Sequence, residues 1–303
     1  MVFQIALSPK TIGIVGWLGK MGKWFVRYFS KRHKSLLVFD IRPNQFHSQS
    51  GLTICKSLDE CVTLSDVVII CVPLVDTVST IEKCALLMRK GASLIEISSI
   101  KYNTFRTLKK IRRHINLLCI HPMFGPGSIK RNTQKVLMIP VKNEERELSI
   151  LNDLFLNLKI IVINDWKTHD RYMSVLLSLA YYVNILFAQC LTDQDMPSLK
   201  SLSGTSFAIQ SLLSESMLTD EPSLIASLFT ESPFVIDLIR KYNFQAATLA
   251  EYIKLRDNSK IKSLIEDTKN ALSKSIDFGT SYSKLYEVYG AFSTKRFGKH
   301  SRF

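Results

Sequence analysis

A glycine-rich turn between a predicted strand and a predicted helix constrains the fold of this chain more than any other feature. The apolar residues 11–15 run directly into Gly16, Gly19 and Gly22, and apolar residues at helical spacing follow over 20–32. In such a turn, one glycine permits the tight bend, one lets the backbone approach a phosphate, and one lets the helix pack on the strand. The free N–H groups at the helix N-terminus can bind a pyrophosphate, so the turn predicts a dinucleotide site.

The spacing of these glycines is irregular. They follow the pattern G-x-x-G-x-x-G, whereas the usual dinucleotide-binding pattern is G-x-G-x-x-G. Either Gly16 serves as the first glycine with one extra residue in the turn, or Trp17 occupies that place. A tryptophan resists positive φ, so we expect the turn to differ locally from the usual one.

Strand and helix patterns alternate along the first half of the chain. The expected strands cover residues 11–15, 36–39, 52–55, 66–72, 93–97, 116–120, 136–141 and 159–163, and the expected helices cover residues 20–32, 58–61, 75–88, 103–113 and 144–158. This alternation predicts an α/β fold with a doubly wound parallel sheet of the Rossmann type, in a domain of residues 1–165.

Strand patterns stop at residue 166, and helical periodicity dominates from there on. The expected helices cover residues 166–191, 198–217, 221–230, 233–242 and 244–276. We therefore expect an all-α C-terminal domain of residues 166–303. Polar residues interrupt the apolar segment 175–191, which predicts a buried helix rather than a membrane span. The N-terminus carries no basic leader, so no signal peptide is expected.

The net charge of +14 suggests an anionic partner. The basic residues are scattered, however, and the dense groups at 31–34 and 109–113 fall where predicted helices end, a place that the helix dipole favours for cations. We expect no nucleic-acid and no membrane partner, and a positive surface also suits an anionic cofactor and substrate. The six cysteines form no CxxC pair, which is typical of reduced thiols in a cytoplasmic protein, and we expect no metal site.

Asp40 ends the second predicted strand. A carboxylate there accepts hydrogen bonds from the ribose hydroxyls of NAD and repels the additional phosphate of NADP. The nearby Arg42 weakens this preference, and a turn residue before Arg42-Pro43 is the alternative interpretation of Asp40. NAD is therefore the expected cofactor, with NADP less favoured. The residues expected to bind it are Gly16, Trp17, Leu18, Gly19, Lys20, Met21, Gly22, Asp40, Val72 and Pro73.

Polar residues follow two further predicted strands, where ligands bind in open α/β sheets. His121 lies directly after the strand that ends at residue 120, and its unperturbed pKa suits the removal of a proton from an alcohol. Ser99 could orient the same hydroxyl, and Lys101 could offer charge to a carboxylate. Taken alone, His121 is equally compatible with a structural loop contact.

Three segments resemble a known enzyme family. IVGWLGKMGKWF, ASLIEISSIKYNTF and especially CIHPMFGP are similar to prephenate dehydrogenase and to the related arogenate dehydrogenases of tyrosine biosynthesis. The resemblance covers the Rossmann half and continues through Thr168-His169-Asp170 into the helical half. It implies oxidation of a ring alcohol by hydride transfer to the nicotinamide, with loss of the ring carboxylate as carbon dioxide. It also implies that the helical domain forms a homodimer and closes the active site.

The resemblance assigns roles to individual residues. It implies that His121 accepts the hydrogen bond of the ring hydroxyl and that Ser99 positions His121 or the hydroxyl, and these two are the expected catalytic residues. The residues expected to contact the substrate are His169, Lys101 and Tyr181.

The chain departs from the family pattern at three positions. Trp17 stands where a glycine is usual, Tyr181 stands where a second histidine is frequent, and Phe234 stands at an arginine that binds the side-chain carboxylate of prephenate. Loss of a carboxylate-binding arginine can cost about 2–5 kcal/mol if the charge is left unpaired. Cations that could replace it are Arg240, Lys241 and Lys101.

Four functions stay open from the sequence. An NAD-dependent prephenate dehydrogenase leads, with an arogenate dehydrogenase as its near variant. Phe234 motivates a relative that acts on another cyclohexadienyl or hydroxy-acid substrate. A non-catalytic cofactor-binding homologue has no need of both Ser99 and His121, and a nucleic-acid-binding protein would require a continuous basic stripe.

Overall fold

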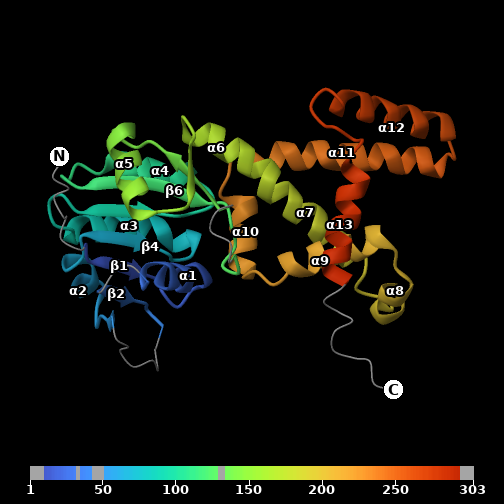
Figure 1. The fold of residues 1–303 in the computed structure, drawn as a ribbon. Coiled ribbons are helices and arrows are strands. Elements are labelled where there is room, and N and C mark those ends of the chain that lie inside the picture. Colours follow the sequence, from blue (N-terminus) through green and yellow to red (C-terminus); the bar gives the residue numbers. More distant parts are fainter. Residues whose placement is uncertain (1–9, 32–34, 43–50, 129–133, 294–303) are drawn as a thin grey trace, which may run out of the picture. The chain divides into compact units, whose positions relative to one another are not determined.

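The computed structural model describes residues 10–31, 35–42, 51–128 and 134–293. It divides into two compact units (Figure 1). The first comprises residues up to 174 together with 226–234, and the second comprises 175–225 and the residues from 235 onward. The predicted boundary at residue 165 falls earlier, because the start of the long helical segment packs against the sheet unit through the contacts described below.

The sheet unit contains an eight-stranded sheet in the order β3-β2-β1-β4-β5-β6-β7-β8. The strands are β1 (Ile12–Val15), β2 (Leu36–Phe39), β3 (Leu52–Ile54), β4 (Val67–Ile70), β5 (Ser93–Glu96), β6 (Asn116–Pro122), β7 (Lys135–Ile139) and β8 (Lys159–Val162). The order from β3 to β6 is the doubly wound Rossmann order, which confirms the predicted fold class.

One strand pair departs from the expected all-parallel sheet. β6 and β7 are antiparallel, with His121 opposite Leu137, whereas every other neighbouring pair is parallel. No helix lies between β6 and β7 in the described residues, and a parallel connection needs a crossover element. β7 therefore runs back along β6.

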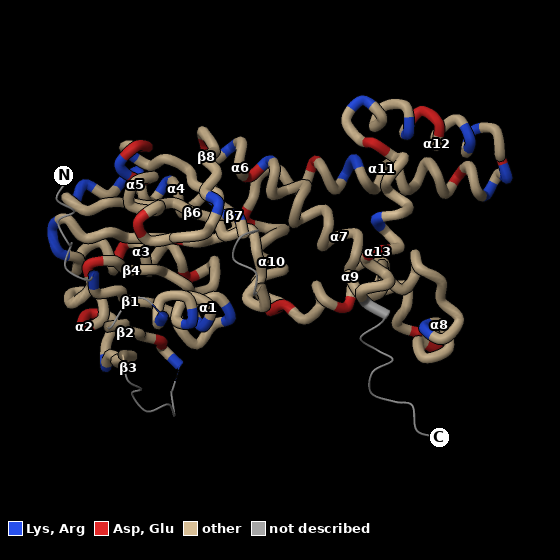
Figure 2. Tube along the Cα trace, viewed as in Figure 1, with Lys and Arg blue, Asp and Glu red and all other residues tan. Residues whose placement is uncertain are grey.

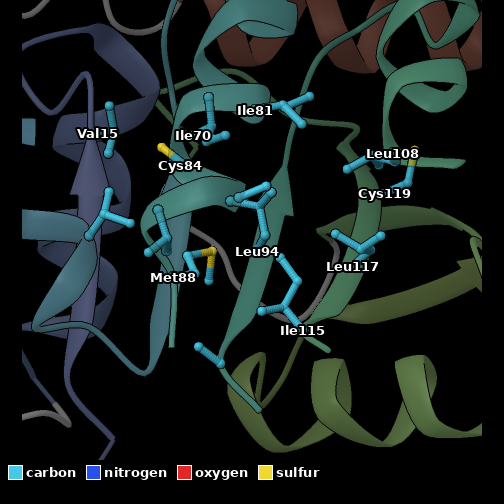
Figure 3. Close-up of a cluster of buried hydrophobic side chains, with 14 of the residues drawn as sticks. Val15, Ile70, Ile81, Cys84, Met88, Leu94, Leu108, Ile115, Leu117 and Cys119 are labelled. Atoms are coloured by element: carbon cyan, nitrogen blue, oxygen red, sulfur yellow. The ribbon is translucent and has the colours of Figure 1, made fainter. Parts of the chain in front are cut away.

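Helices cover both faces of the sheet (Figure 1). They are α1 (Lys20–Phe29), α2 (Leu58–Thr63), α3 (Leu74–Leu87), α4 (Tyr102–Lys110) and α5 (Glu144–Leu154). Apolar side chains of α2, α3 and α4 pack on one face, and those of α1 and α5 pack on the other. In β4, Val68 and Ile70 point into the first cluster, part of which Figure 3 shows, while Val67 and Ile69 point into the second. A strand covered on both faces accounts for the continuous apolar run in the sequence.

The structure of the turn shows whether Gly16 or Trp17 takes the place of the first glycine. Gly16 has a positive φ of 83°, whereas Trp17 does not have a positive φ. Gly19 is the N-cap of α1, and a Cβ on Gly22 would lie 2.4 Å from the Gly16 carbonyl oxygen. Gly16 therefore takes the role of the first glycine, with one extra residue in the turn.

The remaining described secondary-structure elements are all helical, as predicted. They form α6 (Trp166–Met173), the π-helical turn η2 (Ser174–Leu179), α7 (Ala180–Gln189), α8 (Met196–Leu202), α9 (Thr205–Met217), α10 (Pro222–Thr230), α11 (Val235–Lys254), α12 (Asn258–Leu272) and α13 (Ser281–Ser293).

Several predicted helix boundaries are wrong. The predicted helix 198–217 is two helices with Gly204 as the N-cap of the second, because glycine favours a break. The predicted helix 244–276 breaks next to Arg256, which has a φ of 52°. α13 was not predicted.

The segment Trp166–Gln189 forms one long helix with a π-turn inside it. Its most apolar window has a mean hydropathy of 1.3 and is 22% buried, so the expectation of a buried helix is wrong for most of its length. By length and composition alone, this helix could cross a membrane, and α10 with α11 would do so only as a pair bent by 91°. Such a test is also passed by helices of proteins that contain no membrane span.

The charges of the described residues are scattered over both units. Figure 2 shows lysine and arginine on many elements, interspersed with acidic residues, and no single basic stripe along one element. The expectation of no nucleic-acid partner stays a prediction.

We predict that Gly22→Ala lowers the free energy of unfolding by about 1–3 kcal/mol or more, because the added Cβ meets backbone atoms of Gly16 and Trp17 at 2.4 and 2.5 Å. Urea unfolding of the full chain measures the change. Gly127→Ala is the matched control, since a Cβ there meets nothing within 4 Å. Equal stability of the two variants would contradict the packing described for the turn.

Candidate active site

Three chain segments meet at the carboxyl ends of the central strands. Val72 and Pro73 follow β4, the segment 97–101 follows β5, and His121 lies near the end of β6. β5 and β6 are paired in register, with Glu96 opposite Cys119, so the segment after β5 lies beside His121. The topology therefore assembles at one sheet edge the residues that the sequence singled out.

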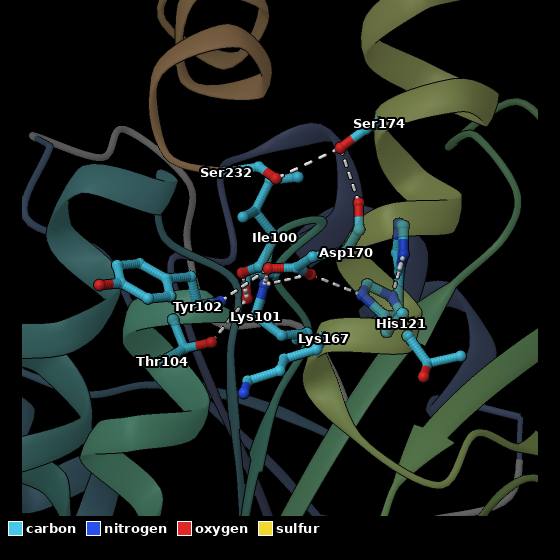
Figure 4. Close-up of polar contacts among 12 residues, drawn as sticks. Ile100, Lys101, Tyr102, Thr104, His121, Lys167, Asp170, Ser174 and Ser232 are labelled. Atoms are coloured by element: carbon cyan, nitrogen blue, oxygen red, sulfur yellow. Dashed lines mark hydrogen bonds and ion pairs between the residues drawn. The ribbon is translucent and has the colours of Figure 1, made fainter. Parts of the chain in front are cut away.

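Two histidines and an aspartate form a chain of hydrogen bonds at this edge. His121 Nδ1 lies 3.1 Å from His169 Nε2, and His169 Nδ1 lies 2.8 Å from Asp170 Oδ1. His169 and Asp170 are on α6, and all three residues are buried. Figure 4 shows His121 and Asp170 at this point of the structure.

Asp170 caps helix α4 from the neighbouring helix α6. Its Oδ1 accepts the backbone N–H of Lys101 at 2.9 Å, and its Oδ2 accepts the backbone N–H of Tyr102 at 2.9 Å. The N-terminus of a helix carries a partial positive charge and unpaired N–H groups, so a carboxylate is favoured there. This capping holds α6 against the sheet unit.

The Lys101 ammonium does not reach toward a substrate. Lys101 is fully buried, and its Nζ lies 2.5 Å from Glu96 Oε1 and 2.6 Å from the carbonyl oxygen of Ile120. The expected contact with a substrate carboxylate is therefore corrected: Lys101 joins the segment after β5 to the residue that precedes His121. Cys119 Sγ lies 2.9 Å from the same Glu96 oxygen.

Burial controls the protonation of both histidines. It lowers the pKa of His121 well below its ordinary value, and the nearby His169 and Lys101 lower it further. Burial also lowers the pKa of His169, although the hydrogen bond to Asp170 acts in the opposite direction. Both imidazoles are therefore neutral at neutral pH, which is the state that a proton acceptor requires.

Ser98 rather than Ser99 carries the hydrogen bonds of its segment. Ser98 Oγ donates to Glu96 Oε2 at 2.6 Å and lies 3.2 Å from the Thr104 hydroxyl. The half-buried Ser99 makes no side-chain hydrogen bond within the described part of the chain. The role of Ser99 toward His121 or a hydroxyl stays a prediction.

Tyr181 belongs to the helical unit, whereas the other expected site residues belong to the sheet unit. Its hydroxyl donates to Asp220 Oδ2 at 2.6 Å. Burial and this carboxylate raise the pKa of Tyr181. Contact between Tyr181 and a substrate stays a prediction.

Phe234 has a cation beside it. The guanidinium of Arg171 lies 5.1 Å from the centre of the Phe234 ring, and Trp166 packs on the same ring at 6.2 Å. Of the cations expected to replace the missing arginine, Arg240 pairs with Asp237 on α11 in the other unit. No pattern in the sequence singles out Arg171, whose position over Phe234 becomes apparent only in the structure.

The glycine turn and Asp40 form the candidate cofactor site. Asp40 Oδ2 accepts the backbone N–H of Leu18 at 3.0 Å, and Arg42 pairs with Asp40 Oδ1 at 2.9 Å. Burial raises the pKa of Asp40, but the hydrogen bonds from Arg42 and Leu18 outweigh it and leave this pKa below its ordinary value. The N-terminus of α1 has no side-chain cap. The N-terminus of a helix favours an anion.

The other expected cofactor residues lie around this turn. Lys20 and Met21 open α1, and Pro73 is the N-cap of α3 just after Val72. A Cβ on Gly16 would lie 2.7 Å from the carbonyl oxygen of Cys71, so the turn and the segment after β4 are in close contact. The described residues contain no group of three or more histidine, cysteine or acidic residues placed to hold a metal ion.

Residues 26–163 match the family described as prephenate dehydrogenase, nucleotide-binding domain. These residues are therefore similar to the nucleotide-binding domain of prephenate dehydrogenases. The match begins within α1, so the glycine turn lies just before the matched residues. It includes β2 to β8 and therefore His121.

Two curated proteins are similar to most of the chain. One is a probable arogenate/prephenate dehydrogenase from Methanocaldococcus jannaschii, 24% identical over 283 residues, or 90% of this chain. The other is the T-protein of Haemophilus influenzae, 22% identical over 245 residues, or 79% of this chain. The chain spans 63% and 62% of the lengths of these two proteins.

Solved structures show the same fold. The prephenate dehydrogenase of Aquifex aeolicus in complex with hydroxyphenyl propionate and NAD⁺ matches with a TM-score of 0.68 at 18% identity, covering 89% of this chain and 99% of that one. An arogenate dehydrogenase from Synechocystis matches with a TM-score of 0.63 at 16% identity, covering 88% of this chain and 100% of that one.

We predict that Lys101→Met destabilises the protein by about 3–5 kcal/mol, because it leaves the Glu96 carboxylate buried without its cation. Urea unfolding measures the loss. The double variant Glu96→Gln/Lys101→Met removes both charges and should recover a large part of it. If Lys101→Met is as stable as the parent protein, the Lys101–Glu96 ion pair does not contribute to stability as described above.

Proposed function

We propose that this protein is an NAD-dependent prephenate dehydrogenase that converts prephenate to 4-hydroxyphenylpyruvate, with arogenate as the near alternative substrate. The observation that carries the proposal is a neutral, buried His121 at the carboxyl end of β6, on the sheet that also carries the glycine turn. The names of the relatives, which include both prephenate and arogenate dehydrogenases, support the reaction class.

The residues of the turn fit a dinucleotide. A Cβ on Gly16 or Gly22 would collide with backbone, so these glycines keep the turn tight at the N-terminus of α1, where a helix favours an anion. In this proposal Asp40 accepts hydrogen bonds from the ribose hydroxyls. NAD, when bound, supplies the nicotinamide ring that takes up the hydride.

His121 acts on the ring hydroxyl of the substrate. A neutral imidazole accepts the hydroxyl proton as the C–H bond at the same carbon gives up its hydride. The carboxylate on the opposite ring carbon leaves as carbon dioxide, and its bonding electrons complete the aromatic ring as a phenolate. This phenolate takes the proton back from His121 to give the phenol. The protein contributes alignment and a dry acceptor, because aromatisation itself favours the products.

Phe234 supports a second candidate function. Where the family has an arginine, this chain has a phenylalanine under the Arg171 guanidinium. If Arg171 binds the side-chain carboxylate, prephenate stays the substrate. If it does not, a relative of prephenate with a different side chain, or another hydroxy acid, fits better.

We extend the proposal to a cytoplasmic homodimer formed by the helical unit. Large apolar side chains are exposed on several of its helices, and a monomer rarely leaves so many uncovered. Examples more than half exposed are Ile236, Phe244, Ile253, Ile265, Tyr282 and Tyr286.

We predict that the purified protein reduces NAD when supplied with prephenate, and that His121→Asn abolishes turnover while NAD still binds. Absorbance of the reduced nicotinamide measures turnover, and titration calorimetry measures binding. Because the pKa of His121 is lowered, kcat/KM of the parent protein should fall only well below pH 6.5. Bound NAD without oxidation of prephenate or arogenate would contradict the proposal, as would an active His121→Asn variant.

We predict that Asp40→Asn shifts the ratio of kcat/KM for NADP to that for NAD upward by on the order of tenfold, because it removes a like charge beside the NADP phosphate. Steady-state kinetics with both cofactors measure the ratio. Asp66→Asn is the matched control, since Asp66 pairs with Arg89 on the surface. An unchanged ratio in Asp40→Asn would remove Asp40 from cofactor selection.

A further inference from the structure

Asp170 is held as a hydrogen-bond acceptor by groups that can only donate. Its two oxygens accept the backbone N–H groups of Lys101 and Tyr102, each at 2.9 Å. A backbone N–H has no alternative role, and the carboxylate sits at the positive end of α4. Asp170 is fully buried, so water does not compete for these oxygens. The acceptor character of Asp170 therefore does not depend on the histidines beside it.

Because Asp170 accepts, it determines which nitrogen atoms of His169 and His121 donate. His169 Nδ1 lies 2.8 Å from Asp170 Oδ1, so Nδ1 carries the proton and donates. A neutral imidazole has one N–H, which leaves Nε2 of His169 with a lone pair. His121 Nδ1 lies 3.1 Å from that lone pair and donates to it. The Nε2 of His121 is then the nitrogen without a proton.

We propose that Asp170 and His169 are positioning residues that fix the tautomer of His121 and leave its Nε2 free to accept the hydroxyl proton of the substrate. The inference rests on the proposed function, in which His121 is that acceptor. It also reassigns His169, which the sequence placed next to the substrate, to a role behind the catalytic histidine.

The same chain stabilises the charge that forms during turnover. When His121 Nε2 takes the proton, the ring becomes an imidazolium whose Nδ1–H still points at His169 Nε2. The negative charge of Asp170 lies at the far end of this chain. The other buried ionisable groups nearby do not cancel it, because Glu96 and Lys101 pair with each other and the raised pKa of Cys119 keeps its thiol neutral.

The tautomers can be measured without any substrate. We expect ¹⁵N NMR of the full chain labelled at histidine to show a protonated Nδ1 and an unprotonated Nε2 for both His121 and His169 at neutral pH. His121→Gln and His169→Gln assign the signals by their loss. A His121 ring that is protonated at Nε2 would overturn the inference.

Activity gives an independent readout. Asp170→Asn should lower kcat by about 10–100-fold with little change in the KM for NAD, and should move the acid limb of kcat/KM to lower pH, because an amide does not stabilise the imidazolium. Asp165→Asn is the matched control: the same substitution on the same helix, at its N-cap. It weakens the cap and should leave the pH profile unchanged. If both variants keep the parent pH profile, Asp170 acts only on stability.

Two substitutions of His169 distinguish a positioning role from a packing role. His169→Gln can still present an acceptor to His121 Nδ1, whereas His169→Leu cannot, so the glutamine variant should retain several-fold more activity. Equal losses in the two variants would contradict the proposal. The predicted tautomers in a protein that oxidises neither prephenate nor arogenate would refute the proposed function and leave the assignment of the tautomers intact. Turnover with a proton on His121 Nε2 would support the proposed function and refute the assignment of the tautomers.

Discussion

The Asp170 carboxylate joins three parts of the sheet unit that are distant in sequence. It caps α4, it belongs to α6, and it hydrogen-bonds His169, which contacts His121 on β6. Without this carboxylate the N-terminus of α4 would keep unpaired N–H groups in a buried setting, and such groups cost free energy. The same contact therefore supports the packing of α6 and the state of the candidate catalytic histidine.

A second buried anchor lies on the other side of His121. The Lys101 ammonium bridges Glu96 at the end of β5 and the carbonyl of Ile120, the residue before His121. Buried ion pairs contribute little net stability compared with apolar packing, but they tolerate only a narrow geometry. We interpret this pair as a device that holds the two strand ends in register around the histidine rather than as a source of stability.

Much of the fold follows from the sequence because the central strands are covered on both faces and each glycine of the turn has a steric cause. The antiparallel β7 did not follow, since apolar periodicity carries no information on strand direction. His121 could be singled out from its place at the carboxyl end of a predicted strand. Asp170 and Glu96 could not be assigned roles, because their partners lie 68 and 5 residues away, on elements whose contact the sequence does not show. Lys101 was misassigned for the same reason: a charged residue in a loop is usually exposed, and here it is buried.

The central claim is that the free Nε2 of His121 faces the reacting hydroxyl while its Nδ1 is held by His169. A crystal structure of this protein with NAD⁺ and hydroxyphenyl propionate, the pair bound in the Aquifex aeolicus relative, tests it most directly. The account predicts the phenolic oxygen about 2.6–3.2 Å from His121 Nε2, with the bonds to His169 and Asp170 retained. A phenolic oxygen bound to another group, or a His121 ring turned so that Nε2 contacts His169, would contradict it.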